Sequence, residues 1–229
     1  MRAPISVVIP TLNSEAGLAL VLRGLGPGLA AGVIREVIVS DGGSQDGTLA
    51  VAEAAGCVLV QGAASRGGQL RRGCAAAAGD WLMILHADSA LPKRWPEVVM
   101  AQVARGRPAA FRLGFRARGV MAAWVAGWAN LRSRLFGLPY GDQGLVVSRA
   151  QYAAAGGYPD QPLMEDVALV RALAQTEARV EVMGAVILTG AERYLAGGWL
   201  RRGARNLWTL MRYFAGVSPE ALAAAYRKR

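Results

Sequence analysis

Residues 1–92 alternate between short apolar runs and stretches in which apolar residues recur with helical spacing. The apolar runs are rich in Val, Ile and Leu, as is typical of strands buried on both faces. Strands that alternate with helices of about ten residues predict βαβ units and a parallel sheet. The expected strands are Ile5–Pro10, Glu36–Ser40, Cys57–Val60 and Trp81–Leu85, and the expected helices are Glu15–Leu25, Asp46–Ala55 and Gly67–Ala78.

The alternation becomes irregular after residue 92, although neither an internal repeat nor a low-complexity linker interrupts the chain. The pattern therefore predicts one α/β domain over residues 1–195, with halves at 1–92 and 93–195. A helical extension is expected over residues 196–229. The elements expected in this part are strands 109–115 and 143–148 and helices 120–135, 165–176 and 199–215.

Composition indicates a globular protein in a reducing compartment. Hydrophobic residues make up 53% and charged residues 18% of the 229 residues, which argues against disorder. Cys57 and Cys74 fit neither a metal-binding spacing nor a disulfide framework, and residues 1–4 show no signal-peptide pattern, so a cytoplasmic protein is expected. The longest uncharged run, Gly119–Leu131, is too short to span a bilayer, which takes about 20 residues.

The net charge of +10 is distributed unevenly along the chain. Residues 93–134 carry +8 and residues 193–229 carry +7, whereas residues 135–192 carry −4 and residues 1–92 carry −1. Basic segments of this kind attract anionic partners such as phosphorylated substrates or lipid headgroups. Nucleic-acid binding is not expected, because aromatic residues do not interleave with the basic residues of 93–118.

Polar residues follow the first two expected strands, at the sheet edge where open α/β proteins bind ligands. Thr11, Asn13 and Glu15 follow the first strand, although an ordinary helix N-cap would also explain them. The second loop, Ser40–Thr48, contains two acids and three glycines, more than a turn requires. A GxGxxG motif is missing after the first strand, which disfavours a dinucleotide site.

A third loop, Ala64–Arg72, places three arginines and two glycines at the start of an expected helix. Backbone N–H groups, the positive end of the helix dipole and guanidinium groups all favour phosphate there. A solvated basic turn is the alternative interpretation.

The run Trp81–Leu85 ends in His86-Ala87-Asp88, and His86 is the only histidine of the chain. Two positions apart on an extended backbone, the imidazole and the carboxylate lie on the same side. Such a pair suits one edge of a divalent-metal site. The alternative is a strand end with a capping Asp and a half-buried histidine.

The acidic middle of the chain offers further carboxylates. Asp142 and Gln143 precede an expected strand, and Glu165 and Asp166 open an expected helix. Paired acids at a helix start are common partners of the helix dipole, so they do not by themselves define a site.

In combination, these motifs resemble those of the family 2 glycosyltransferases, nucleotide-sugar-dependent enzymes of the A-type fold. The similarity covers residues 4–170 and is greatest to a small soluble bacterial subgroup with His-Ala-Asp at the metal motif. It implies a Rossmann-like nucleotide-sugar-binding domain with a mainly parallel central sheet and a C-terminal helical extension. The matching segments are Ser6–Asn13, Glu36–Thr48, Gly79–Asp88 and Met164–Asp166.

The resemblance implies a catalytic role for several acids. Asp166 would be the general base that deprotonates the acceptor hydroxyl, with Glu165 beside it and Asp142 as the next candidate. Asp88, together with His86, would hold the Mg²⁺ or Mn²⁺ that bridges the donor diphosphate. A histidine in place of the usual first Asp favours Mn²⁺ over Mg²⁺.

The resemblance also implies a donor pocket, most often for a UDP-sugar in this family. Asp41 would accept hydrogen bonds from the base, Asp46 would support its loop, and Arg66, Gln69 and Arg71 would lie near the phosphates. The full set of implied nucleotide-sugar contacts is Pro10, Thr11, Asn13, Glu15, Asp41, Gly42, Asp46, Arg66, Gly67, Gln69, Arg71, Ala87 and Gln143.

The family's enzymes of this type invert the anomeric centre in one displacement. The processive motif Gln-x-x-Arg-Trp is absent, with Glu192-Arg193-Tyr194 in its place, so a single transfer per encounter is expected. A nucleotidyltransferase on a related fold is the alternative enzyme, although its Gly-rich, Lys-containing loop is missing. A non-catalytic membrane- or anion-binding module is the alternative outside enzymes.

Two apolar and aromatic stretches, Gly119–Leu135 and Trp199–Ala215, lie within the basic segments. We expect them to form a patch that docks on anionic membrane, where a lipid-linked acceptor would be presented. The protein would then be peripheral on the inner face of the membrane. The alternatives are that these helices pack on the sheet or form a homodimer contact.

Overall fold

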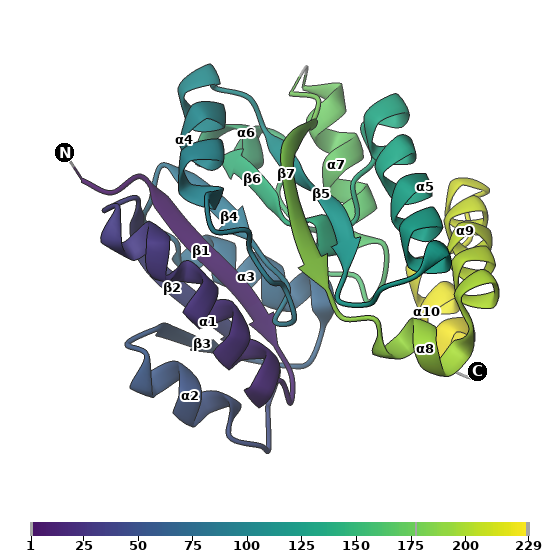
Figure 1. Ribbon diagram of the computed structural model, residues 1–229, viewed down its shortest axis with the longest axis horizontal. Helices are drawn as coiled ribbons and strands as arrows, with labels where there is room; N and C mark the ends of the chain where they lie inside the picture. Colours follow the sequence, from purple (N-terminus) through teal and green to yellow (C-terminus); the bar gives the residue numbers. More distant parts are fainter. Residues whose placement is uncertain (1, 177, 228–229) are drawn as a thin grey trace.

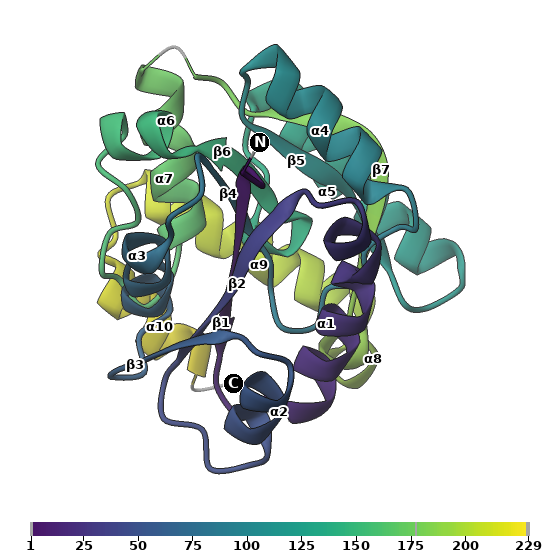
Figure 2. The ribbon, with the colours of Figure 1, turned by 90° about the vertical axis from the view of Figure 1, so that its left-hand side faces the viewer.

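The computed structural model describes residues 2–176 and 178–227, so positions 228–229 of the basic segment 193–229 lie outside the described residues. Within this part of the chain, a seven-stranded sheet crosses the molecule and helices cover both of its faces (Figure 1, Figure 2). The strands are β1 (Ile5–Thr11), β2 (Ile34–Asp41), β3 (Val58–Gln61), β4 (Trp81–Ile84), β5 (Ala109–Phe115), β6 (Leu145–Ser148) and β7 (Glu181–Thr189). The helices are α1 (Glu15–Ala30), α2 (Thr48–Ala54), α3 (Arg66–Ala76), α4 (Trp95–Arg105), α5 (Val120–Phe136), α6 (Arg149–Ala154), α7 (Glu165–Gln175), α8 (Glu192–Gly197), α9 (Trp199–Phe214) and α10 (Pro219–Arg227), with a 3₁₀ turn, η1, at Gly141–Gln143.

The strands lie in the order β3-β2-β1-β4-β6-β5-β7. Among the described strands, β6 alone is antiparallel to its neighbours, so the expected α/β class with a mainly parallel sheet is confirmed. The strand order reverses at β1, because β2 and β3 lie on one side of it and β4 lies on the other. In open α/β sheets, ligands bind at the carboxyl ends of the two strands that flank such a switch point. Figure 1 shows these ends at the lower edge of the sheet.

Two apolar layers hold the helices on the sheet, and Figure 2 shows α1 and α4 on one side of the sheet and α3 and α7 on the other. One layer joins α1 and α4 to the sheet, and the other joins α3 and α7 to its opposite face. In the first layer the buried Trp95 donates from Nε1 to the carbonyl of Gly24 at 3.0 Å. A Cβ on Gly28 would lie 2.2 Å from the Trp95 ring, so only glycine permits this close contact.

The predicted strands and helices are present, with shifts of a few residues at their ends. The last predicted strand begins at Leu145 because Gly141–Gln143 forms η1 before it. Helix α4 and strand β7 were not predicted. The buried face of α4 includes the polar residue Gln102, which obscures the apolar period, and β7 is an edge strand with exposed positions.

The C-terminal helices pack against the main body of the protein. Met164 and Val167 of the α7 region form one apolar cluster with Leu210 of α9 and Leu222 of α10. No helix of the described residues has both the length and the apolar character needed to cross a membrane.

Candidate active site

Four segments converge at the carboxyl ends of the parallel strands. They are the loops after β1, β2 and β4 and the start of α3, and the acidic start of α7 faces them from the other half of the sheet. Because each segment follows a buried strand or opens a helix, the sheet fixes where its polar side chains lie.

The loops after β1 and β2 are bound to each other. The backbone N–H of Gln45 donates to Asn13 Oδ1 at 2.8 Å, and the backbone of Asn13 has a positive φ of 48°. The N–H of Glu15 donates to Asp46 Oδ2, and the N–H of Gly47 donates to Glu15 Oε2, both at 3.1 Å. The residues that the resemblance assigns to the nucleotide pocket therefore also hold the pocket together.

Asp41 is buried at the end of β2, and its own loop occupies both carboxylate oxygens. Oδ2 accepts from Thr11 Oγ1 at 2.9 Å and from Ser44 Oγ, and Oδ1 accepts from the N–H groups of Gly43 and Ser44 at 2.8 Å. Burial acts to raise the pKa of Asp41, but the donors, led by Ser44, outweigh it and lower that pKa. In this arrangement Asp41 shapes the loop, and its contact with a base stays a prediction.

Gln69 and Arg71 bond to other groups of the protein, and their implied place near the phosphates stays a prediction. The Gln69 amide is buried beneath the loops and donates to the carbonyl oxygens of Thr11 at 2.7 Å and Ser40 at 3.1 Å. Arg71 points to Asp160, with 3.5 Å between its nitrogen and the carboxylate. Gln69 therefore supports the loops, because its amide nitrogen is already bonded to the backbone.

Arg66 extends from the first turn of α3 toward the start of α7 and the turn after β4. Its Nε lies 3.2 Å from Glu165 Oε1, and a terminal nitrogen lies 3.5 Å from His86 Nε2. A Cβ on the next residue, Gly67, would lie 2.1 Å from the carbonyl oxygen of Pro159. The glycine thus lets the start of α3 press against the segment that leads to α7.

His86 and Asp88 lie in the turn after β4. Asp88 Oδ2 accepts from Thr189 Oγ1 at 3.0 Å and from the N–H of Gly190 at 3.2 Å. Burial acts to raise the pKa of Asp88, but neighbouring His86 and then Thr189 outweigh it and lower that pKa. Burial, followed by the charge of Arg66, lowers the pKa of His86 to about 4. At neutral pH the pair is thus a carboxylate and a neutral imidazole, the forms that bind divalent metals.

The donor set fits a cation that is shared with a ligand. The hydrogen bonds from Thr189 and Gly190 both go to Oδ2 of Asp88, so they do not use the second carboxylate oxygen, Oδ1. Within residues 2–176 and 178–227, no group of three or more His, Cys, Asp or Glu side chains could hold a metal ion. Asp88 and His86 would therefore supply part of a coordination shell that phosphate oxygens complete.

Gly141 joins the metal motif to the start of α7. Its N–H donates to Asp166 Oδ2 at 2.7 Å, and a Cβ on this residue would lie 2.6 Å from His86 Nε2. The other oxygen of Asp166, Oδ1, accepts from the N–H of Val167 at 2.7 Å. The structure thus brings His86 and Asp166 together at Gly141, and their roles as metal ligand and base stay predictions.

Acidic groups behind Asp166 are poorly solvated. Burial raises the pKa of Asp142 to about 6, and burial followed by the Asp166 carboxylate raises the pKa of Glu165 to about 7. Asp142 Oδ1, Glu165 Oε2 and the Tyr140 hydroxyl are enclosed and find no hydrogen-bond partner among the described residues. Groups of this kind are typical of functional sites.

Gln143 and Ala87 both contact other parts of the protein, and their implied ligand contacts stay predictions. Gln143 is buried, accepts from Ser133 Oγ at 2.7 Å and donates to the Phe111 carbonyl at 3.0 Å. The carbonyl oxygen of Ala87 would lie 2.4 Å from a Cβ on Gly17, so it lies against α1. The amide of Gln143 joins α5, η1 and β5, and its implied contact with the nucleotide-sugar stays a prediction.

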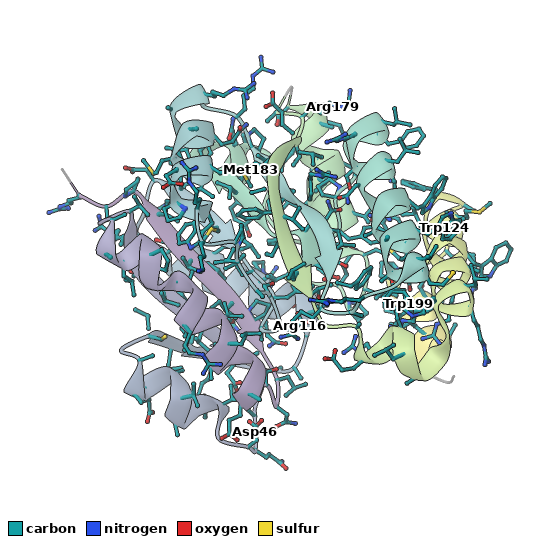
Figure 3. All side chains as sticks on the ribbon, in the orientation of Figure 1. Asp46, Arg116, Trp124, Arg179, Met183 and Trp199 are labelled. Carbon is teal, nitrogen blue, oxygen red and sulfur yellow. The ribbon has the colours of Figure 1, made fainter. Side chains whose placement is uncertain are left out.

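Sequence reasoning missed the contribution of the end of β7. Thr189 and Gly190 hold Asp88, and Arg116 at the end of β5 lies near them, with its guanidinium 3.9 Å from Glu192 (Figure 3). The dipeptide Thr189-Gly190 at the end of a β-branched run was a usable signal, but β7 itself was not predicted.

The chain belongs to glycosyl transferase family 2, whose family model matches residues 6–134, and it is therefore a glycosyltransferase. Among curated proteins, no match was found.

Solved structures with a similar fold are also glycosyltransferases. Glucosyl-3-phosphoglycerate synthase from Mycobacterium tuberculosis, in complex with Mn²⁺ and uridine-diphosphate-glucose, is 23% identical with a TM-score of 0.58, over 82% of this chain and 69% of that chain. The same synthase with Mn²⁺, UDP and glucosyl-3-phosphoglycerate is 26% identical with a TM-score of 0.53, over 82% and 70%. The mannosyltransferase PcManGT from Pyrobaculum calidifontis, with GDP-Man and Mn²⁺, is 18% identical with a TM-score of 0.63, over 82% and 57%. These similarities support the A-type glycosyltransferase fold.

Glu165→Gln tests the charge balance behind the site. Because burial raises the pKa of Glu165 from 4.5 to about 7, the folded state binds more protons than the unfolded state in this window, and stability falls as the pH rises through it. Glu165→Gln removes that loss. Relative to wild type, the variant should therefore gain free energy of unfolding on the order of 3 kcal/mol between about pH 5 and 8, measured by urea unfolding.

Glu97→Gln is the matched control, because Glu97 forms an exposed ion pair with Arg94 at 2.8 Å. Its difference in free energy of unfolding from wild type should be small, because an exposed ion pair contributes little to stability. A difference for Glu165→Gln that does not change between about pH 5 and 8 would contradict a raised pKa of Glu165.

Proposed function

We propose that the chain transfers a sugar from a nucleoside-diphosphate sugar, with a UDP-sugar as the expected donor, to an acceptor hydroxyl with the help of a divalent cation. The proximity of Arg66, His86, Asp88 and Asp166 supports this proposal, because a guanidinium that could bind phosphate, two side chains that could hold a metal and a carboxylate that could act as a base would lie in one site. The similar structures were solved with UDP-glucose or GDP-Man and Mn²⁺, which supports this class of donor.

The nucleotide would lie on the joined loops after β1 and β2. Residues Pro10–Glu15 and Asp41–Asp46 form that surface, and the bonds between Asn13, Glu15 and the second loop keep it open. Arg66 would turn its guanidinium from Glu165 to the diphosphate, where it stabilises the charge that builds up on the leaving group.

Asp88 and His86 would hold Mn²⁺ or Mg²⁺ next to the diphosphate. When bound, the cation supplies positive charge that stabilises the departing nucleoside diphosphate. The neutral imidazole of His86 favours Mn²⁺, since nitrogen ligands suit transition metals better than Mg²⁺.

Asp166 would accept the proton of the acceptor hydroxyl from the face opposite the leaving group. Gly141 and Val167 donate to its two oxygens and fix the orientation of the carboxylate. One displacement with one base inverts the anomeric centre. The absence of the Gln-x-x-Arg-Trp motif favours a single transfer per encounter.

We also propose the division of the chain into a catalytic domain, 1–195, and a C-terminal helical extension, 196–229. The first half, 1–92, would bind the nucleotide, and the second half, 93–195, would bind the acceptor. The two unpaired cysteines, Cys57 and Cys74, support a reducing compartment such as the bacterial cytoplasm.

A donor screen tests the proposed activity. UDP-, GDP- and dTDP-sugars are added with and without Mn²⁺, and the melting temperature is recorded. One donor should raise it by about 5–10 °C at about 100 times its Kd, and only with Mn²⁺ present.

The product identifies the reaction. Release of nucleoside diphosphate supports glycosyl transfer, whereas release of pyrophosphate would indicate a nucleotidyltransferase. Binding of anions without any turnover on a panel of hydroxyl acceptors would favour a non-catalytic module.

A further inference from the structure

Helix α5 is apolar on both of its sides. One side packs on β5 through buried residues that include Ala122, Val125 and Ala129. The opposite side is exposed, and in Figure 3 Trp124 lies on it at the right-hand edge of the molecule. A helix that is apolar all round is normally covered on every side. The exposed apolar residues of α5 are Val120, Trp124, Trp128, Leu131, Leu135 and Phe136.

Helix α9 contacts α5 and adds a second exposed apolar stripe (Figure 1). Arg202 and Arg205 lie on its other side, where they donate to Tyr226 of α10 at 2.6 and 3.0 Å. We call the exposed apolar sides of α5 and α9 together the α5–α9 face. The residues contributed by α9 are Leu200, Leu207, Trp208, Met211 and Phe214.

The α5–α9 face is larger than scattered surface residues would explain. Trp124 and Trp208 are 58% and 60% exposed, and they lie among apolar neighbours at helical spacing. Contiguous exposed patches of this kind mark sites that bind another molecule or a membrane. Tryptophan, in particular, is enriched where a protein meets the headgroup region of a bilayer.

Charge distinguishes the two candidate partners of the α5–α9 face, a second copy of this chain and an anionic lipid surface. The exposed charged residues that argue this point are the arginines at or next to α5 and α9. Arg118, Arg134 and Arg201 are exposed at or next to these helices. A second copy of this chain would bring the same positive charge against the face, which opposes dimerisation, whereas anionic lipid headgroups complement it.

We propose that the α5–α9 face docks on an anionic lipid surface. The aromatic side chains enter the headgroup region and the flanking arginines bind lipid phosphates. In this arrangement, none of the helices that the structure describes crosses the bilayer. The docking itself does not depend on catalysis.

The face lies directly behind the proposed acceptor side of the site. On the inner side of α5, Ser133 donates to Gln143, and Arg132 stacks over the Tyr140 ring at 3.5 Å. A bilayer on this face therefore lies close to the Tyr140–Gln143 segment. Resting on the proposed function, this position predicts an amphiphilic acceptor whose hydroxyl headgroup reaches the site from the membrane.

Vesicle co-sedimentation of the full chain tests the docking without donor or acceptor. With vesicles of equal parts phosphatidylglycerol and phosphatidylcholine at low ionic strength, wild type should sediment, and added salt should release it. Vesicles of phosphatidylcholine alone should bind much less. Brominated lipids should quench tryptophan fluorescence, because Trp124, Trp128 and Trp208 are exposed whereas Trp81 and Trp95 are buried.

Paired variants separate the face from general surface effects. Trp124→Ser with Trp208→Ser, and Arg118→Glu with Arg201→Glu, should each lower vesicle affinity about tenfold or more. The controls are Leu29→Ser with Val58→Ser and Arg23→Glu with Arg35→Glu. They change exposed residues of α1, β2 and β3, away from the α5–α9 face. They should leave the affinity unchanged, and thermal melts should show that all variants fold.

The proposal is overturned if wild type stays in the supernatant at low salt, or if the control pairs lose as much affinity as the face variants. A dimer in sedimentation equilibrium that Trp124→Ser with Trp208→Ser dissociates, without vesicle binding, would assign the face to a second copy. Because donor binding and turnover are measured separately, failure of docking leaves the proposed transfer intact, and failure of transfer leaves the docking result intact.

Discussion

Asp166→Asn is expected to lower turnover by on the order of 10²-fold or more, while the affinity for the nucleotide-sugar stays near that of wild type. An amide cannot accept the proton of the acceptor hydroxyl. The carboxylate accepts from the N–H of Gly141 at Oδ2 and from the N–H of Val167 at Oδ1, and the single oxygen of Asn keeps one of these two hydrogen bonds, so the fold should persist with a small loss of stability. Initial rates and donor titrations on the same protein measure the two quantities.

Glu165→Gln is the control for this result, since Glu165 lies next to Asp166 but faces Arg66. Its loss of turnover should be smaller. Near-normal turnover of Asp166→Asn would instead transfer the base role to Asp142, whose pKa is raised to about 6 by burial.

The second large effect concerns the metal. Asp88→Asn should abolish Mn²⁺-dependent binding of the nucleotide-sugar, because an uncharged amide is a much weaker ligand for a divalent cation than a carboxylate. An Asn oxygen can still accept from Thr189 and Gly190, so the fold should remain intact. Calorimetric titration with and without Mn²⁺ measures the loss.

His86→Ala should weaken the metal dependence more mildly, because a phosphate oxygen or water can replace one neutral ligand. Arg94→Ala, an exposed change on the surface, should bind as wild type does. Full-strength donor binding by Asp88→Asn, with or without Mn²⁺, would refute the assignment of Asp88.

The fold was predictable where the signal is local. Apolar runs such as Ile5–Pro10 and Trp81–Leu85 specify buried strands without reference to the rest of the chain. Helix α4 was hidden by the buried Gln102, whose amide donates to Glu181 on β7, a partner that spacing does not indicate. Edge strand β7 lacks the continuous apolar run of a central strand.

The candidate site was predictable as a set of loops but not as a set of contacts. Gln69 and its partner Thr11 are 58 positions apart, and Gln143 and its partner Phe111 are 32 apart. A polar residue near a ligand loop looks the same in sequence whether its amide faces the ligand or the backbone. Tertiary packing decides which group the amide faces, and here the side-chain nitrogens of Gln69 and Gln143 both donate to backbone carbonyl oxygens.

The bonds between the loops after β1 and β2 have a consequence for donor selection. Since Asn13 and Glu15 already hold the second loop through Gln45, Asp46 and Gly47, this surface loses little conformational freedom when a nucleotide arrives. A preformed binding surface discriminates between ligands by their shape. Selectivity between pyrimidine and purine bases should therefore depend on the fixed spacing of these two loops. Loop substitutions that break the bonds between them should broaden the range of accepted donors before they weaken binding.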